Sequence, residues 1–229
     1  MIRRVTKTKL FYLCCIVTCV TAPALAEERA GSEYNDHLVP IDGIIEPAYQ
    51  TLLSQKLFIT PANFVRMVIL PSAASEGEIA IAIHSEPTKS EEKVFVTCTK
   101  AKKNLWYAAS DESGALSKNT SSIQIARYDV PIPKTVAMTI MKGIRRMLGQ
   151  CKPLDKTNKT FVDETDIEVL LESSPSRYVK GLLTPHARGV SGTALRRITH
   201  LLEAYCGATP GNREQLLEKI EAKAKQLAK

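Results

Sequence analysis

The chain has 229 residues, of which 31 are Lys or Arg, 24 are Asp or Glu and four are His, and its formal net charge is +7. This length is enough for one medium-sized domain with a real hydrophobic core. No two His are spaced i, i+4, and the chain has no Cys-x-x-Cys, no Walker-type phosphate loop and no Gly-x-Gly-x-x-Gly. Because the common metal-binding and nucleotide-binding signatures are missing, we expect no metal and no cofactor.

The first 26 residues predict a cleavable signal peptide. They open on a basic segment whose charges come from Arg3, Arg4, Lys7 and Lys9. A short apolar run at 10–20 follows, and Ala24, Leu25 and Ala26 form the small-x-small pattern that a signal peptidase cuts, just before Glu27. We therefore expect a periplasmic or secreted protein with no stable membrane span after cleavage.

Two alternatives for this segment are disfavoured. The apolar run is shorter than the ~20 residues that a membrane span needs, which argues against an uncleaved anchor. The residues before Cys14 and Cys19 lack the small side chains that lipid attachment requires. Removing the signal leaves 27 basic residues against 24 acidic ones, a net charge of +3. Much of the positive charge therefore belongs to the signal, and we infer no nucleic-acid binding from it.

After the signal, 27–46 predicts a flexible leader and 47–229 predicts a single globular domain. The first half of this domain has strand patterns, of which 78–84 is the clearest because Ile79, Ile81 and Ile83 alternate with other residues. We expect a short helix at 47–57, followed by strands at 64–70, 78–84, 93–99, 105–109 and 122–128.

The clearest helix is expected at 131–150, where apolar residues recur at three- and four-residue steps. Pro131 and Pro133 mark its start, and Pro153 prevents its continuation. We expect a hairpin at 166–172 and 178–183, then helices at 193–206 and 212–229. Grouped strands predict an α+β fold, with a mainly antiparallel sheet of about five to seven strands and three main helices packed on one face.

Three cysteines remain after cleavage, namely Cys98, Cys151 and Cys206. An oxidising compartment favours pairing, and an odd number predicts one disulfide and one thiol. Cys151 and Cys206 each stand at the end of an expected helix, so a Cys151–Cys206 disulfide is favoured and Cys98–Cys151 is the next choice. Three unpaired buried thiols are the alternative.

The sequence offers no defensible catalytic residue. Ser191 lies in Gly-Val-Ser-Gly, which lacks the complete Gly-x-Ser-x-Gly pattern, and is interpreted as part of a loop or a helix cap. Cys98 lies among valines and is interpreted as a small buried hydrophobe or a disulfide partner. The acidic residues of 163–168 are expected to form a solvated entrance to a strand.

Two weak binding sites are predicted. The loop 184–189 leads into a helix whose free N–H groups attract anions, and His186 and Arg188 add positive charge for a carboxylate or a phosphate. An ordinary connecting loop is the competing interpretation. The second site is a basic patch for anionic lipid or an acidic partner, with a solvated helix surface as the competing interpretation. Its residues are Lys142, Arg145, Arg146, Arg196 and Arg197.

Trp106 and Tyr107, on an expected strand near the basic turn at 100–103, form a third candidate surface, because aromatic and basic residues often anchor interfaces. The missing catalytic signatures favour a non-catalytic binding or accessory module of the bacterial cell envelope. Its partner would be an envelope protein or an anionic ligand, and not nucleic acid. The alternatives are an envelope hydrolase with a site assembled from distant residues and a secreted factor that acts outside the cell.

Overall fold

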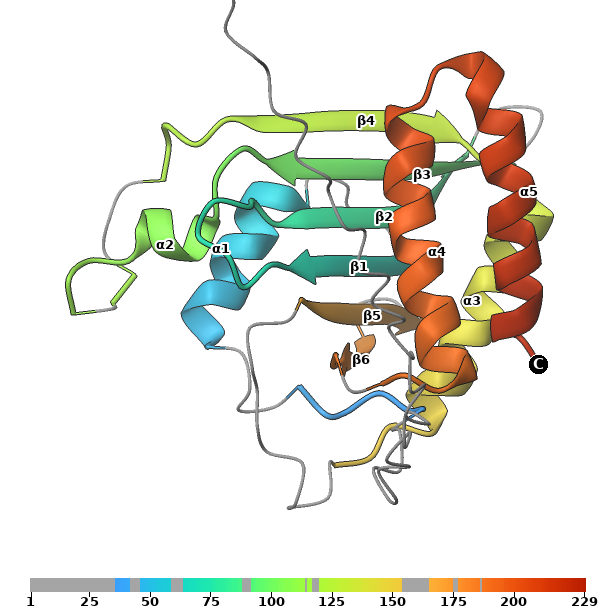
Figure 1. The fold of residues 1–229 in the computed structure, drawn as a ribbon, viewed down its shortest axis with the longest axis horizontal. Coiled ribbons are helices and arrows are strands. Elements are labelled where there is room, and N and C mark those ends of the chain that lie inside the picture. The colour runs from blue at the N-terminus through green and yellow to red at the C-terminus, as the bar shows by residue number, and fades with distance from the viewer. Residues whose placement is uncertain are drawn as a thin grey trace, which may run out of the picture. The chain divides into compact units, whose positions relative to one another are not determined.

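The computed structural model contains six strands in one antiparallel sheet within the residues that it describes (Figure 1). Those residues are 36–41, 46–58, 64–87, 92–113, 115–116, 120–153, 165–174, 177–185 and 187–229. The strands are β1 (Val65–Leu70), β2 (Ile79–Pro87), β3 (Glu92–Ala101), β4 (Ile125–Pro131), β5 (Asp166–Ser174) and β6 (Arg177–Leu183). Their order across the sheet is β4-β3-β2-β1-β5-β6.

The strand register makes one face of this sheet apolar. Met67 of β1 pairs with Ile81 of β2 and with Val169 of β5. Ile81 in turn pairs with Cys98 of β3, and all four side chains are buried. Because successive side chains of a strand point to opposite faces, these paired residues share one face. The alternation predicted for 78–84 is therefore confirmed.

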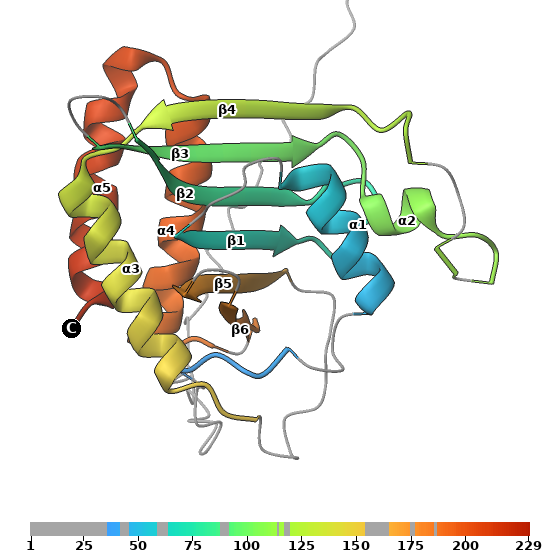
Figure 2. The same cartoon turned by 180° about the vertical axis from the view of Figure 1, so that it is seen from behind.

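Three long helices cover the apolar face, and Figures 1 and 2 show them gathered at one end of the sheet. They are α3 (Lys134–Gly149), α4 (Val190–Gly207) and α5 (Pro210–Leu227). Thr199 Oγ1 of α4 lies 3.4 Å from Met67 Sδ, so this helix contacts the sheet directly. Gly143 lets α3 approach α5 closely, because a Cβ there would lie 2.5 Å from Leu227 Cγ. The predicted α+β class is confirmed.

Two shorter helices pack on the opposite face, at the other end of the sheet from α3, α4 and α5 (Figure 2). They are α1 (Pro47–Leu57), which confirms the expected helix, and α2 (Leu105–Ala109). Their buried contacts with the sheet form a second cluster, made of Leu53, Leu57, Val68, Ala80, Ala101 and Leu105. The rings of Tyr49 and Trp106 meet edge to face with 5.2 Å between centroids, which joins α1 to α2.

The strand predicted at 105–109 is wrong, because these residues form helix α2. The Leu105 N–H donates to the Glu78 carboxylate, with N–O distances of 2.7 and 2.9 Å. The Tyr107 N–H donates to Asn104 Oδ1 at 3.2 Å. These acceptors satisfy amides that a first helical turn leaves free. The other expected helices and strands are present, with ends displaced by a few residues.

Residues 36–41, which the sequence assigns to the leader, pack against β6. The Val39 N–H donates to Leu182 O at 2.9 Å, and the Leu182 N–H donates back to Val39 O at 2.8 Å. Leu38 and Ile41 are buried beside this bridge. The segment therefore belongs to the compact unit Tyr34–Lys229. The predicted signal at 1–26 and the leader residues 27–35 and 42–45 lie outside the described residues.

Candidate functional site

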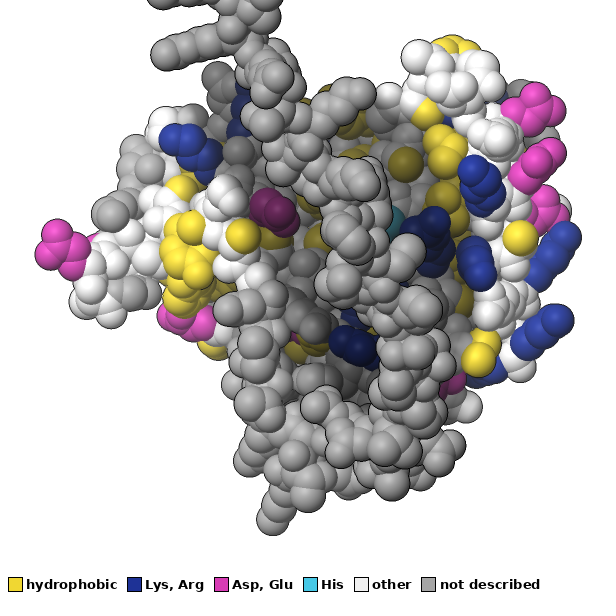
Figure 3. Space-filling model, viewed as in Figure 1, with side chains coloured by type: hydrophobic (Ala, Val, Ile, Leu, Met, Phe, Trp, Pro, Cys, Tyr) yellow, Lys and Arg dark blue, Asp and Glu magenta, His cyan; other side chains and the backbone are white. Residues whose placement is uncertain are grey.

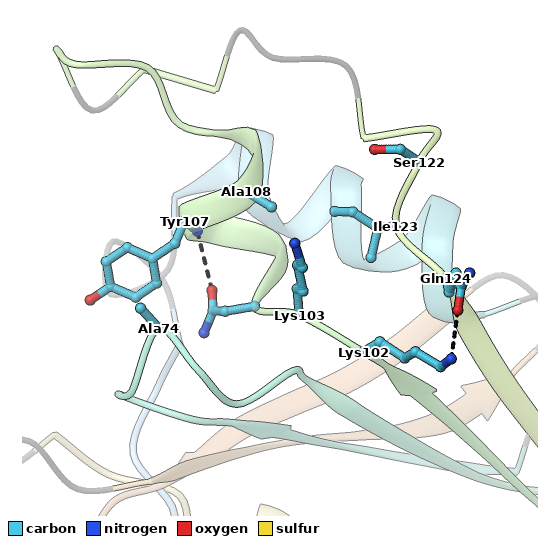
Figure 4. A pocket seen from close by; sticks show the side chains of 9 residues that line it. Ala74, Lys102, Lys103, Tyr107, Ala108, Ser122, Ile123 and Gln124 are labelled. Atoms are coloured by element: carbon cyan, nitrogen blue, oxygen red, sulfur yellow. Dashed lines mark hydrogen bonds between the residues drawn. The ribbon is translucent and has the colours of Figure 1, made fainter.

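A hollow of about 690 Å³ beside α2 brings an exposed aromatic ring together with lysines (Figure 4). Tyr107 is 53% exposed and lines it with Lys102 and Lys103. Figure 4 shows Tyr107 on one side and Gln124 on the other, where Lys102 Nζ donates to Gln124 Oε1 at 2.5 Å. The structure thus joins Tyr107 with two of the lysines named from the sequence, whereas Trp106 packs on Tyr49.

Side-chain hydrogen bonds position this hollow. Asn104 begins α2 and donates from Nδ2 to Pro71 O and to Ala73 O, both at 3.4 Å. The Tyr107 hydroxyl donates to Ser72 O at 3.5 Å. The helix is therefore held to the loop between β1 and β2, and that loop also lines the hollow through Ala74.

A second hollow, of about 700 Å³, runs beside α4 on the apolar side of the sheet. Ile69 and Ile79 contribute its apolar lining from β1 and β2. His200 and Glu203 are spaced i, i+3, so both project from the same side of α4. The hollow therefore has an apolar floor and one polar helical wall.

Charged groups meet at the rim of this second hollow. Lys100 Nζ of β3 lies 3.1 Å from Glu203 Oε1, and His200 Nδ1 lies 3.8 Å from Glu203 Oε2. The neighbouring His200 and Lys100 hold the pKa of Glu203 below its usual value. The ionised carboxylate joins α4 to β3 at the surface.

A third hollow, of about 550 Å³, lies at the start of α4 and contains two arginines. Arg188 is exposed, whereas Arg196 is half-buried. The Arg196 guanidinium donates to Thr165 O at 3.0 Å and to Thr184 O at 2.8 Å. Arg196 therefore braces the hollow, and Arg188 is the exposed arginine of its lining.

The second hollow shares lining residues with each of the other two. Lys102 lines the first and the second, and Thr165 and His200 line the second and the third. Among their described lining residues, five are Lys or Arg and two are Glu. We call the three together the basic groove. Figure 3 shows Lys and Arg side chains together with acidic ones on the side of the molecule where α4 and α5 lie, and α5 lines none of the three hollows.

The anion site predicted at the start of α4 has a partner from within the chain. Asp36 Oδ1 accepts the Gly192 N–H at 2.8 Å, so a carboxylate from the leader meets one of the free amides of this helix. The sequence contained no signal for this contact, since the two residues are 156 positions apart. Arg188 lines the third hollow, and His186 lies outside the described residues.

The residues of the predicted basic patch have different environments. Lys142 and Arg145 of α3 and Arg197 of α4 are exposed. Arg146 is half-buried and donates to Ser191 Oγ at 2.8 Å, which links the end of α3 to the start of α4. Ser191 is therefore engaged in a hydrogen bond between helices. Of the five, Arg196 lines the basic groove.

The three cysteines of the described chain are all free, so the structure contains no Cys151–Cys206 disulfide. Cys206 instead donates to Val96 O at 3.7 Å and lies near the Cys98 thiol, which shifts its pKa. Cys151, just beyond α3, is half-buried, and burial raises the pKa of its thiol. Cys98 is buried in β3, in line with the interpretation of a small hydrophobe or a disulfide partner.

A buried polar network lies on the sheet face opposite α4. His84 Nε2 lies 2.8 Å from Thr97 Oγ1, and the Thr97 hydroxyl donates to Asp129. Because that hydroxyl donates its only proton to Asp129, its oxygen accepts a hydrogen bond from the His84 Nε2–H. Burial lowers the pKa of His84, which favours the neutral ring. This network lines none of the hollows described here.

Glu168 is buried rather than solvated, so its assignment to a solvated strand entrance is wrong. Its carboxyl lines a separate hollow of about 320 Å³ beside α1, together with Arg66 and Lys180. Burial raises the pKa of Glu168. Glu168 and Glu203, both with displaced pKa values, lie in different hollows.

Comparisons of the chain with protein-family models, curated proteins and solved structures found no match. In the described part of the chain, no helix is long and apolar enough to cross a membrane. The same residues contain no cluster of His, Cys, Asp or Glu suited to a metal ion. Function must therefore be inferred from the chemistry of the basic groove.

Proposed function

We propose that this protein is an exported, non-catalytic binding module of the bacterial cell envelope, and that it binds an acidic segment of an envelope protein. The observation that supports this most is the basic groove, whose adjoining hollows have five basic and two acidic lining residues in the described chain. Positive charge at Lys102, Lys103 and Arg188 attracts carboxylates and steers a negatively charged partner towards the groove.

The lining of the groove favours a polypeptide over a small ion. Tyr107 at one end, and Ile69 and Ile79 between the charged ends, offer apolar contact along the path. A binding surface with apolar contacts in its centre and polar residues at its rim matches the usual anatomy of protein interfaces. An extended acidic segment would contact the lysines at one end and Arg188, whose guanidinium suits paired hydrogen bonds to a carboxylate, at the other.

Export is supported by the sequence, through the basic start, the short apolar run and the small residues that precede Glu27. The test is to express the full chain in a bacterium with a tag after Lys229, fractionate the cells and sequence the amino terminus. We expect a periplasmic product that begins at Glu27. A cytosolic product that still begins at Met1 would contradict the proposal.

Binding is tested with the protein recovered from the periplasm and a fluorescent glutamate-rich peptide, followed by anisotropy. Reversing two charges with Lys102→Glu and Lys103→Glu should weaken binding about tenfold or more. The matched control is Lys142→Glu with Arg145→Glu, because these exposed residues of α3 lie outside the groove. Equal weakening by both double variants would show attraction to net charge alone and would refute the groove as the site.

The natural partner is sought by pull-down from an envelope extract, followed by mass spectrometry. We expect an acidic envelope protein that the wild type and the α3 control retain and the groove variant loses. A protein retained equally by all three forms would count against the groove.

A further inference from the structure

Two thiols from distant parts of the chain meet in the core between β3 and α4. Cys98 pairs with Ile81 on the apolar sheet face, so its side chain points towards the helices. Cys206, in the last turn of α4, has its Sγ 3.7 Å from Val96 O of the same strand. Cys98 and Cys206 are each 2% exposed, and they lie close enough for each thiol to shift the pKa of the other.

We propose that Cys98 and Cys206 form the disulfide of the exported protein and link β3 covalently to α4. This rests on the proposed export, because disulfides persist in oxidising compartments, but it does not depend on the proposed ligand. It replaces the pairing predicted from helix ends, since Cys206 meets Cys98 across the core. Cys151 is then the thiol left over.

The reaction balances as a thiol–disulfide exchange. The thiolate of one of the two cysteines attacks a sulfur of an oxidant disulfide, such as oxidised glutathione or an envelope thiol oxidase, and one thiol of the oxidant leaves. The thiol of the other cysteine then loses its proton and attacks the first cysteine's sulfur, which releases the second thiol. Two protein thiols lose two electrons and two protons, and the oxidant disulfide becomes two thiols.

The depth of the pair dictates when the bond forms. With 2% of each residue exposed, an oxidant cannot reach either sulfur in the folded protein. The exchange must therefore occur while α4 is still undocked from the sheet. The finished bond should then resist reductant until the protein unfolds.

The crosslink lies beneath the rim of the basic groove. Lys100 follows Cys98 by two residues in β3, so it faces the same side, and Glu203 lies one helical turn before Cys206 in α4. Lys100 and Glu203 form the 3.1 Å ion pair that joins the helical wall to the sheet. A covalent bond between Cys98 and Cys206 would hold this wall and floor together.

The pairing is tested by unfolding and reducing the purified protein, refolding it with reduced and oxidised glutathione, alkylating the remaining thiols and mapping the peptides by mass spectrometry. We expect a peptide that joins Cys98 to Cys206 and alkylation at Cys151. A linked peptide that contains Cys151, or alkylation of all three residues, would overturn the proposal. Because refolding takes place in vitro, this result does not depend on whether the chain is exported.

Variants provide a second readout. Cys151→Ala should still give the peptide that joins Cys98 to Cys206. Its urea midpoint should be lower after the protein has been unfolded, reduced and refolded with reductant present. Cys98→Ala should have a midpoint that does not respond to reductant, because the crosslink is gone. A reductant response retained by Cys98→Ala would refute the pairing. If Cys98→Ala does not fold, the peptide map of Cys151→Ala decides the question alone.

Discussion

The two faces of the sheet are built from the same strands but are stabilised by different physics. The face under α3, α4 and α5 is covered by aliphatic side chains such as Ile81 and Ile144, both fully buried. The opposite face buries polar groups, among them Glu78, His84 and Glu168. On the first face, the stabilisation from apolar burial needs no specific geometry and grows with the area that is buried. On the second face, hydrogen-bond partners offset the cost of burying Glu78 and His84.

This difference predicts different responses to substitution. A truncation on the helical face removes contacts and leaves a cavity, so its effect depends on volume. A truncation on the polar face leaves another group without its partner, so its effect depends on hydrogen bonding and on pH. The following substitutions separate these two kinds of stabilisation.

The largest effect is expected from Ile144→Ala in α3. Ile144 is fully buried among the helices and the sheet, so its truncation should lower the free energy of unfolding by about 2–5 kcal/mol. The matched control is Arg145→Ala, the exposed neighbour, which should change it by less than about 0.5 kcal/mol. Urea denaturation followed by circular dichroism measures both. Similar losses in the two variants would contradict the assigned burial.

The next effect is expected from Glu78→Ala on the polar face. Glu78 accepts the Leu105 N–H and the Tyr49 hydroxyl, so its removal leaves buried donors without acceptors. We expect a loss of about 1–3 kcal/mol. Because Trp106 is the only tryptophan and lies in α2, its fluorescence should shift to the red as this helix loosens.

The conservative change Glu78→Gln tests the reason for that loss. Glutamine keeps an acceptor oxygen, so Glu78→Gln should lower the free energy of unfolding by less than Glu78→Ala does. The exposed Glu76→Ala, in the same loop, should leave Trp106 emission unchanged. An emission shift with Glu76→Ala, or none with Glu78→Ala, would show that Glu78 does not anchor α2.

A smaller, pH-dependent effect is expected from His84. Burial lowers the pKa of His84 from its ordinary 6.5, so the unfolded chain binds a proton at higher pH than the folded one. The stability contributed by the neutral ring is therefore present above about pH 6.5 and is lost as pH falls through the lower folded value. His84→Gln should flatten this dependence below pH 6.5 in urea titrations.

The Ile144→Ala variant serves as the control for that measurement. It removes no titratable group, so it should lower stability at every pH and keep the slope of the wild type. If His84→Gln keeps the same acid slope as the wild type, His84 is not a source of the pH dependence.

The sequence predicts the helical face well because short-range periodicity determines it. The three- and four-residue steps within 131–150 predict a helix, and the structure has α3 there. The alternation within 78–84 predicts a strand, and the structure has β2 there. The polar face and the basic groove depend instead on partners far away in the chain. Glu78 caps α2 from 27 residues away, and this contact turns an expected strand into a helix.

In the candidate site, too, contacts between residues far apart in the chain could not be predicted from the sequence. Arg196 was assigned to an exposed patch, but two backbone carbonyls bind its guanidinium, and no local pattern identifies such acceptors. Asp36 reaches the start of α4 from the leader. Charge and residue type identified Arg188 and Tyr107, because exposed side chains at a groove need no distant partner to be recognised.

The smallest effect on stability and a clear effect on binding are expected from Arg188→Ala. Arg188 is exposed at the third hollow, so the free energy of unfolding should change by less than about 0.5 kcal/mol. The thermal stabilisation that the glutamate-rich peptide confers on the wild type should shrink, because ligand stabilisation follows affinity. Arg188→Lys should retain part of it, since it keeps the charge but not the paired hydrogen-bond geometry. An unchanged response in Arg188→Ala would remove this end of the groove from the binding site and leave the α2 hollow as the remaining candidate.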